Sequence, residues 1–239
     1  MTPILVLLLA MALVGFGAWW WWTLEQKRKA ELASFAAAKG WTFASVDPYQ
    51  LDERWRGSPF GRGDSRKASN VFTGVAPNGY SLLAFDYKYT EERTDSKGSR
   101  SSTTYRFAVC AIRLPCPLPG LHVGKENMLT RIGSVVGFAD IEFESEDFNR
   151  AFRVQCDDPK FASDVLHPRA MEMLLAHGRG SEWRFEGVDM LSWRSGRIDV
   201  PDLLQRVDLM CRVIKSIPAF VWKDRGYDPG PQTQTLGGR

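Results

Sequence analysis

The longest apolar stretch of the chain stands at its start. No charged side chain occurs before Glu25, and the run closes with four consecutive tryptophans: Trp19, Trp20, Trp21 and Trp22. Pro3 to Trp22 is 20 residues, and a helix rising about 1.5 Å per residue spans roughly 30 Å over that length, one hydrocarbon core. Indole side chains favour the headgroup level of a bilayer. The pattern predicts a transmembrane anchor over residues 1–24, with the tryptophans at its far end.

A cleaved signal peptide is the alternative for this stretch, since Ala10-Met11-Ala12 resembles a small-x-small cleavage site. Signal peptides begin with a cationic segment, however, and the α-amine is the one positive charge here before the apolar run. Lys27, Arg28 and Lys29 directly follow the tryptophans. The positive-inside bias therefore predicts a retained anchor in the cell membrane, with the N-terminus outside and the C-terminal bulk in the cytoplasm.

The pattern changes after the anchor. Residues 25–40 are rich in Ala, Glu, Lys and Leu and end at Gly40, which predicts a juxtamembrane helix. Residues 41–222 read as about eight short strands and two or three packed helices, so we expect a cytoplasmic α+β domain with a mostly antiparallel sheet. Residues 223–239, rich in Gly, Pro, Gln and Thr, are predicted to be a disordered tail.

Within the domain, the strongest turn signal is Ala76-Pro77-Asn78-Gly79, between strands predicted over 70–75 and 80–89. Residues 103–114 are apolar on both faces in the middle, which predicts a central strand that ends at the prolines of 115–119. A second hairpin is expected around 187–189. Residues 201–217 carry an apolar stripe at helical spacing, which predicts one buried helix face: Leu203, Val207, Met210, Ile214 and Ile217.

Charge is unevenly distributed, although the whole chain carries only +3. From Arg54 to Arg106 there are ten Lys and Arg against five Asp and Glu, whereas from Asp140 to Asp189 there are six against twelve. Such asymmetry bears on partners and orientation rather than on fold. Residues 56–69, with three glycines and several cations, are predicted to form a basic loop.

The four cysteines have no C-x-x-C spacing. Cys156 and Cys211 fall on apolar faces of predicted elements, and Cys110 lies in a run apolar on both faces. These three are expected to be buried free thiols, which is typical of a reducing compartment. The cysteines therefore favour a cytoplasmic domain.

Several motifs together resemble a group of uncharacterised single-pass bacterial membrane proteins with a cytoplasmic domain of unknown function. The residues that carry the resemblance are Gly40-Trp41-x-Phe43, Arg106-Phe107-Ala108-Val109 with the prolines after it, 146–154 with Asp158-Pro159, and 218–222. The resemblance spans about residues 35–230. It implies an anchor and a fold, and no activity.

No residue pattern makes a persuasive catalytic or metal site. The three histidines lack an H-x-x-x-H or H-E-x-x-H pattern, and His167 before Pro168 is expected to close a helix. Glu142 and Glu144 alternate with apolar residues, as on the solvated face of a strand. The glycines at 57–63 match neither a dinucleotide nor a P-loop motif, and no nucleic-acid-binding signature appears. We expect no cofactor, no metal and no nucleic acid partner.

These observations favour a membrane-tethered cytoplasmic interaction module without catalytic activity. The alternative is a membrane-associated, hydrolase-like enzyme that uses carboxylates of the acidic region, and a deep pocket gathering Glu142, Glu144, Asp157 or His167 would favour it. The bilayer and an unidentified protein are the expected partners. A basic surface beside a membrane also favours contact with anionic lipid headgroups, for which the candidate residues are Arg54, Arg56, Arg62, Arg66 and Lys67.

Overall fold

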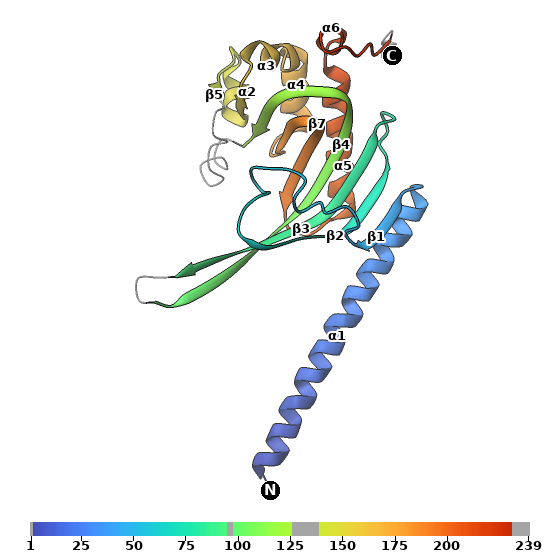
Figure 1. Ribbon diagram of the computed structural model, residues 1–239, viewed down its shortest axis with the longest axis vertical. Helices are drawn as coiled ribbons and strands as arrows, with labels where there is room; N and C mark the ends of the chain where they lie inside the picture. The colour runs from blue at the N-terminus through green and yellow to red at the C-terminus, as the bar shows by residue number, and fades with distance from the viewer. Residues whose placement is uncertain (1, 95–97, 126–138, 231–239) are drawn as a thin grey trace.

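One long helix carries the rest of the molecule. The computed structural model describes residues 2–94, 98–125 and 139–230, and Figure 1 shows α1 (Thr2–Ala38) running away from the sheet toward the N-terminus. The helix is long and apolar enough to cross a membrane, and its large apolar side chains from Leu5 to Trp22 are exposed. It continues without a break through the juxtamembrane segment and ends before Gly40, whose φ of +68° reverses the chain.

Seven strands of the described residues form one antiparallel sheet, in the order β1-β2-β3-β4-β6-β5, with β7 also paired to β4. The predicted α+β class with a mostly antiparallel sheet is therefore confirmed. The strands are β1 (Thr42–Val46), β2 (Asp64–Val75), β3 (Ser81–Thr94), β4 (Arg100–Gly124), β5 (Ala139–Ile141), β6 (Arg153–Cys156) and β7 (Trp183–Ser195).

Five further helices lie among the described residues: α2 (Glu146–Ala151), α3 (Pro159–Val165), α4 (Pro168–His177), α5 (Val200–Ser216) and α6 (Ala219–Lys223). The side chains of Asp158 and Asp199 cap the N-termini of α3 and α5. The expectation that His167 closes a helix was wrong. His167 opens α4, because its Nδ1 accepts a hydrogen bond from the backbone N–H of Ala170 at 3.4 Å.

The two faces of the sheet are covered by different parts of the chain. On one face the main core joins the sheet to α5 and to the last turns of α1, where Leu32 and Ala36 are buried. On the other face the segment between β1 and β2 folds back over β3, β4 and β7. It inserts Leu51, Trp55 and Phe60 into a second core cluster. The predicted basic loop, residues 56–69, therefore lies against the sheet, because Phe60 within it and Leu51 and Trp55 just before it are buried there.

Three strand predictions need correction. β4 does not end at the prolines: it continues to Gly124, because Pro115, Pro117 and Pro119 fall where the register with β7 shifts and ladder hydrogen bonds are interrupted. β2 begins at Asp64, within the segment predicted as loop. In place of the hairpin expected around Gly187, the chain forms one strand, β7, which pairs with β4 on both sides of Gly187.

The C-terminal region agrees with its apolar pattern. α5 buries Leu203, Val207, Met210 and Ile214 against the sheet, as the stripe predicted. The chain then runs through α6, where the Trp222 ring lies 6.0 Å from that of Tyr227. Residues 231–239 of the predicted tail lie outside the described residues.

A first test concerns α5. Met210 is 1% exposed and its sulfur lies 3.5 Å from that of Cys110 on β4. Met210→Ala should lower the free energy of unfolding by about 2–5 kcal/mol, because it leaves a cavity in the main core. Chemical denaturation in detergent measures the change. Arg212→Ala, on the exposed side of the same helix, is the matched control; it breaks only the exposed pair with Asp208 and should cost about 0–1 kcal/mol. Equal effects would show that α5 is peripheral.

A second test concerns the cysteines, all four of which are free and buried. Burial raises the pKa of Cys110 to about 12 and that of Cys156 to about 11. Since the thiolate is the reactive form, iodoacetamide at pH 8 should leave all four thiols unmodified in the folded protein. All four should react after unfolding without reductant, as counted by mass spectrometry. A disulfide between any pair contradicts this and the cytoplasmic expectation.

Candidate functional site

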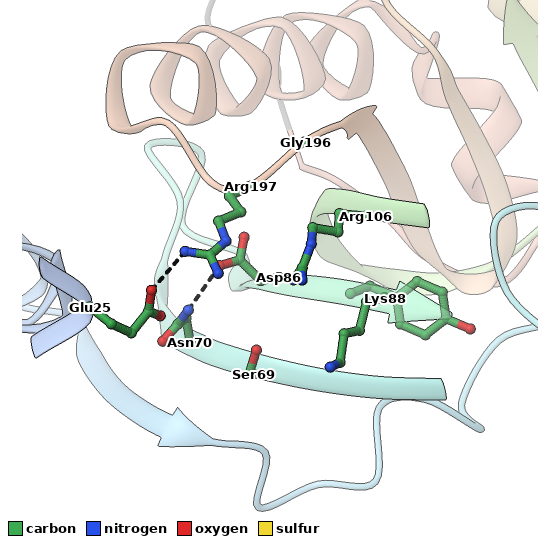
Figure 2. Close-up of a pocket in the computed structure, with 9 residues that line it drawn as sticks. Glu25, Ser69, Asn70, Asp86, Lys88, Arg106, Gly196 and Arg197 are labelled. Carbon is green, nitrogen blue, oxygen red and sulfur yellow. Dashed lines mark hydrogen bonds and ion pairs between the residues drawn. The ribbon is translucent and has the colours of Figure 1, made fainter. Parts of the chain in front are cut away.

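A buried carboxylate joins the membrane helix to the sheet. Asp86, on β3, is 8% exposed. Its carboxylate accepts hydrogen bonds from the backbone N–H of Ile198 at 2.6 Å and from the side-chain amide of Asn70 at 2.8 Å. Arg28 of α1 adds an ion pair to Asp86 at 3.3 Å and donates to the Ile198 carbonyl at 3.0 Å. Four parts of the chain therefore meet at this one side chain: α1, β2, β3 and the β7–α5 connection. Figure 2 shows Asp86 with Asn70 beside it.

A second ion pair lies one helical turn closer to the apolar end of α1. The Arg197 guanidinium, also from the β7–α5 connection, contacts the Glu25 carboxylate at 2.8 Å. Glu25 and Arg28 are three positions apart and so lie on the same side of the helix. The two pairs together fix both the angle and the rotation of α1 against the sheet.

Beside these pairs, three cations stand in one row across neighbouring strands. The register places Lys67 of β2 opposite Lys88 of β3, and Lys88 opposite Arg106 of β4. Residues opposite each other in a sheet share a face, and like charges in that arrangement repel. Within the described part of the chain, none of the three side chains has a carboxylate partner. The row is therefore an uncompensated positive feature.

Lys88 and Arg106 of the row, Asp86 and the Glu25–Arg197 pair line a small surface cavity of about 50 Å³, the junction pocket, shown in Figure 2. Its lining comes from α1, from β2, β3 and β4, and from the β7–α5 connection: Glu25, Ser69, Asn70, Asp86, Tyr87, Lys88, Arg106, Gly196 and Arg197. Both carboxylates are already paired with arginines, so the unpaired charge of this junction pocket is positive.

The height of the junction pocket along α1 follows from helix geometry. Glu25 is three residues beyond Trp22, a rise of about 4.5 Å. The four tryptophans are exposed on α1, as expected for side chains at a bilayer interface. If α1 spans a bilayer, the pocket lies at the level of the lipid headgroups.

The cations predicted to contact the membrane surface divide into two groups. Arg54 pairs with Asp189 at 3.0 Å, and its guanidinium stacks over the Trp55 ring. The Arg56 backbone binds the side chains of Glu186 and Arg184. These contacts hold the β1–β2 segment in place.

The second group faces the start of the β3–β4 hairpin. Arg62 hydrogen-bonds Tyr89, whereas Arg66 and Lys67 are exposed on β2. Of the predicted juxtamembrane cations, Lys27 is exposed, Lys29 is half-buried and Arg28 turns inward to Asp86. Lys67 and Arg28 thus lie next to two residues that line the junction pocket, Lys88 and Asp86. Arg54 and Arg56 instead contact residues of β7.

The residues proposed for the alternative enzyme are not gathered in a cleft. Glu142, Glu144 and Asp157 are exposed, and the His167 ring lies 3.0 Å from the Ser216 carbonyl. None of them lines the junction pocket, the cavity whose lining includes Leu83 or the cavity whose lining includes Glu182. Among the described residues, no three His, Cys, Asp or Glu side chains are grouped to hold a metal ion.

Sequence reasoning missed Asp86, Lys88, Arg106 and Arg197. One signal for Asp86 was present, because it is a charged residue inside the apolar run 82–87. The row of cations had no comparable signal, since its members come together only through the register of three strands.

Comparison with known proteins gives a structural likeness. No protein-family profile matches the chain, and no curated protein sequence matches it. One similar solved structure is that of the mycobacterial trehalose monomycolate transport factor A, TtfA, with a TM-score of 0.54 and 13% identity. The match covers 80% of this chain and 96% of that one. At this identity the likeness shows the fold alone, and the resemblance to single-pass bacterial membrane proteins stays a prediction.

The junction yields a third test. Asp86→Ala removes the acceptor of three hydrogen bonds and leaves buried donors unpaired, so it should lower the free energy of unfolding by about 2–3 kcal/mol. Asp208→Ala is the control, because it breaks the exposed pair with Arg212 and should cost about 0–1 kcal/mol. Urea titration of the full chain in detergent compares the two. If Asp86→Ala were as stable as the control, the hydrogen bonds of Asp86 would not be what stabilises the junction.

Proposed function

We propose that this protein is a membrane-tethered cytoplasmic binding module, in which α1 is a retained anchor and the domain binds its partner at the membrane surface. The observation that carries the proposal is the junction itself. Glu25 and Arg28 of α1 are bound to Arg197 and Asp86 of the domain, and the helix continues directly into the core. The domain is therefore held at one angle to the anchor.

A fixed angle is useful for binding and has no evident use in simple tethering. A flexible linker would suffice to keep a domain near a bilayer. Here Leu32 and Ala36 are buried in the main core, so tilting the domain would expose apolar surface and break two ion pairs. The same surfaces of the domain then always face the bilayer and the cytoplasm.

On this proposal, the surface that faces the bilayer is the one on the side of the N-terminal part of α1. The β3–β4 hairpin projects toward the side of the molecule where the N-terminal part of α1 runs, whereas α6 lies at the opposite end. The membrane-facing side thus includes the hairpin base with Arg66, Lys67 and the junction pocket. We place lipid contact there rather than at Arg54, whose charge Asp189 already compensates.

A binding role also fits the other observations. The carboxylates of the alternative enzyme are exposed and dispersed. TtfA, which shares the fold, is a mycobacterial transport factor. The orientation follows from Lys27, Arg28 and Lys29, which come after the apolar run.

The location has a direct test. Protease added to intact cells should leave the domain undigested, and the same protease should digest it after permeabilisation. The chain should remain in the membrane fraction after alkaline extraction. Digestion in intact cells, or a mature chain that begins near Leu13, would contradict the proposal.

The fixed orientation has its own test in nanodiscs of phosphatidylcholine alone. Because the native thiols are buried, a fluorophore can be attached at Ser102→Cys in the hairpin or at Lys215→Cys near the end of α5; both positions are exposed. Energy transfer to an acceptor on the lipid headgroups should be clearly higher from position 102. Equal transfer from both positions would show that the domain tumbles, and higher transfer from 215 would show the reverse orientation.

A further inference from the structure

The junction pocket combines three properties that together specify a ligand. It is small, it is lined by unpaired cations, and it lies about 4.5 Å beyond Trp22 along α1. Each property alone is common on protein surfaces. Their coincidence at one place is what needs explanation.

The charge of the pocket calls for an anion. Lys88 lies between Lys67 and Arg106 in the strand register, so the sheet holds three positive charges side by side (Figure 2 shows Lys88 and Arg106). The nearest carboxylates, Asp86 and Glu25, are bound to arginines. An anion in the pocket would relieve the repulsion within the row and accept charge-assisted hydrogen bonds from it.

The size of the pocket limits which anion fits. A cavity of about 50 Å³ is far below the roughly 300–1,000 Å³ of pockets that enclose a metabolite or cofactor. It admits one compact group, such as a phosphate, while the remainder of the ligand stays outside. A phosphate also offers several anionic oxygens to be shared between an ammonium group and the planar fork of a guanidinium.

The position of the pocket supplies the source of that phosphate. If α1 spans the bilayer, as the proposed function requires, the pocket opens at headgroup depth, where lipid phosphates are the most abundant anions. The glycerol and acyl chains would lie outside the cavity, beside α1. Headgroups with a choline or ethanolamine bring a second, positive group toward Lys88 and Arg106, which disfavours them.

We propose that the junction pocket binds the phosphate of an anionic phospholipid, with Lys88 and Arg106 as its principal ligands and Lys67 and Arg197 beside them. This rests on the proposed function, since it requires α1 to be an anchor. The bound headgroup bridges the sheet and the bilayer on the same side as the Asp86 junction. Where anionic lipid is present, it adds a second attachment of the domain to the bilayer beside α1.

The test uses the full chain in nonionic detergent and isothermal titration with three probes: dioctanoyl phosphatidylglycerol, dioctanoyl phosphatidylcholine and inorganic phosphate. Phosphatidylglycerol should bind one to one, at least tenfold more tightly than either other probe. Its affinity should fall as salt is raised from 0.05 to 0.5 M. Lys88→Gln with Arg106→Gln should weaken it at least tenfold.

The matched control is Arg169→Gln with Lys215→Gln, which removes two exposed cations far from the pocket and should leave the affinity within twofold. Equal affinity for phosphatidylcholine, or no loss in the Lys88/Arg106 variant, would overturn the proposal. Phosphate bound as tightly as phosphatidylglycerol would make this a site for soluble anions and overturn the lipid assignment. The orientation experiment uses phosphatidylcholine alone, so failure of the tether and failure of this site are distinguishable.

Discussion

The structure depends on one buried carboxylate. Asp86 neutralises Arg28, caps the start of the β7–α5 connection through the Ile198 N–H and holds the Asn70 side chain. A buried charge is costly unless it is paired and hydrogen-bonded. Asp86 therefore constrains everything around it: moving α1, β2 or the connection leaves it or its partners unsatisfied. Through these contacts Asp86 attaches the apolar helix α1 to the sheet.

The same constraint explains the positive charge of the junction pocket. The ion pairs of Arg28 and Arg197 neutralise Asp86 and Glu25, and the cations of the row have no carboxylate partner among the residues that the structure describes. The segment between β1 and β2 acts on the opposite face, where Trp55 and Arg54 both bind Asp189. Basic residues of the chain therefore fall into two groups: Arg54 pairs with a carboxylate on that face, whereas Lys88 and Arg106 have no carboxylate partner among the described residues at the junction.

Much of the fold could be predicted from the sequence because it depends on local periodicity. The apolar run, the stop at Gly40, the turn at 76–79 and the stripe of α5 each follow from neighbouring residues. The course of β4 through its prolines could not be predicted, since a bulge is tolerated only where partner strands allow it. The pairing of Arg54 with a residue 135 positions away, and the row through Lys88, depend on tertiary register. The candidate site was therefore the part that sequence reasoning placed least well.

The central claim is that α1 and the domain form one rigid body, and the most direct measurement is a distance distribution across the junction. Nitroxide labels at Gln26→Cys on α1 and Ser102→Cys in the hairpin, both at exposed positions, report it by pulsed electron resonance in nanodiscs. The account predicts a single narrow distribution that broadens when Asp86→Ala is added. A broad distribution in the otherwise native chain, or no effect of that substitution, would contradict it.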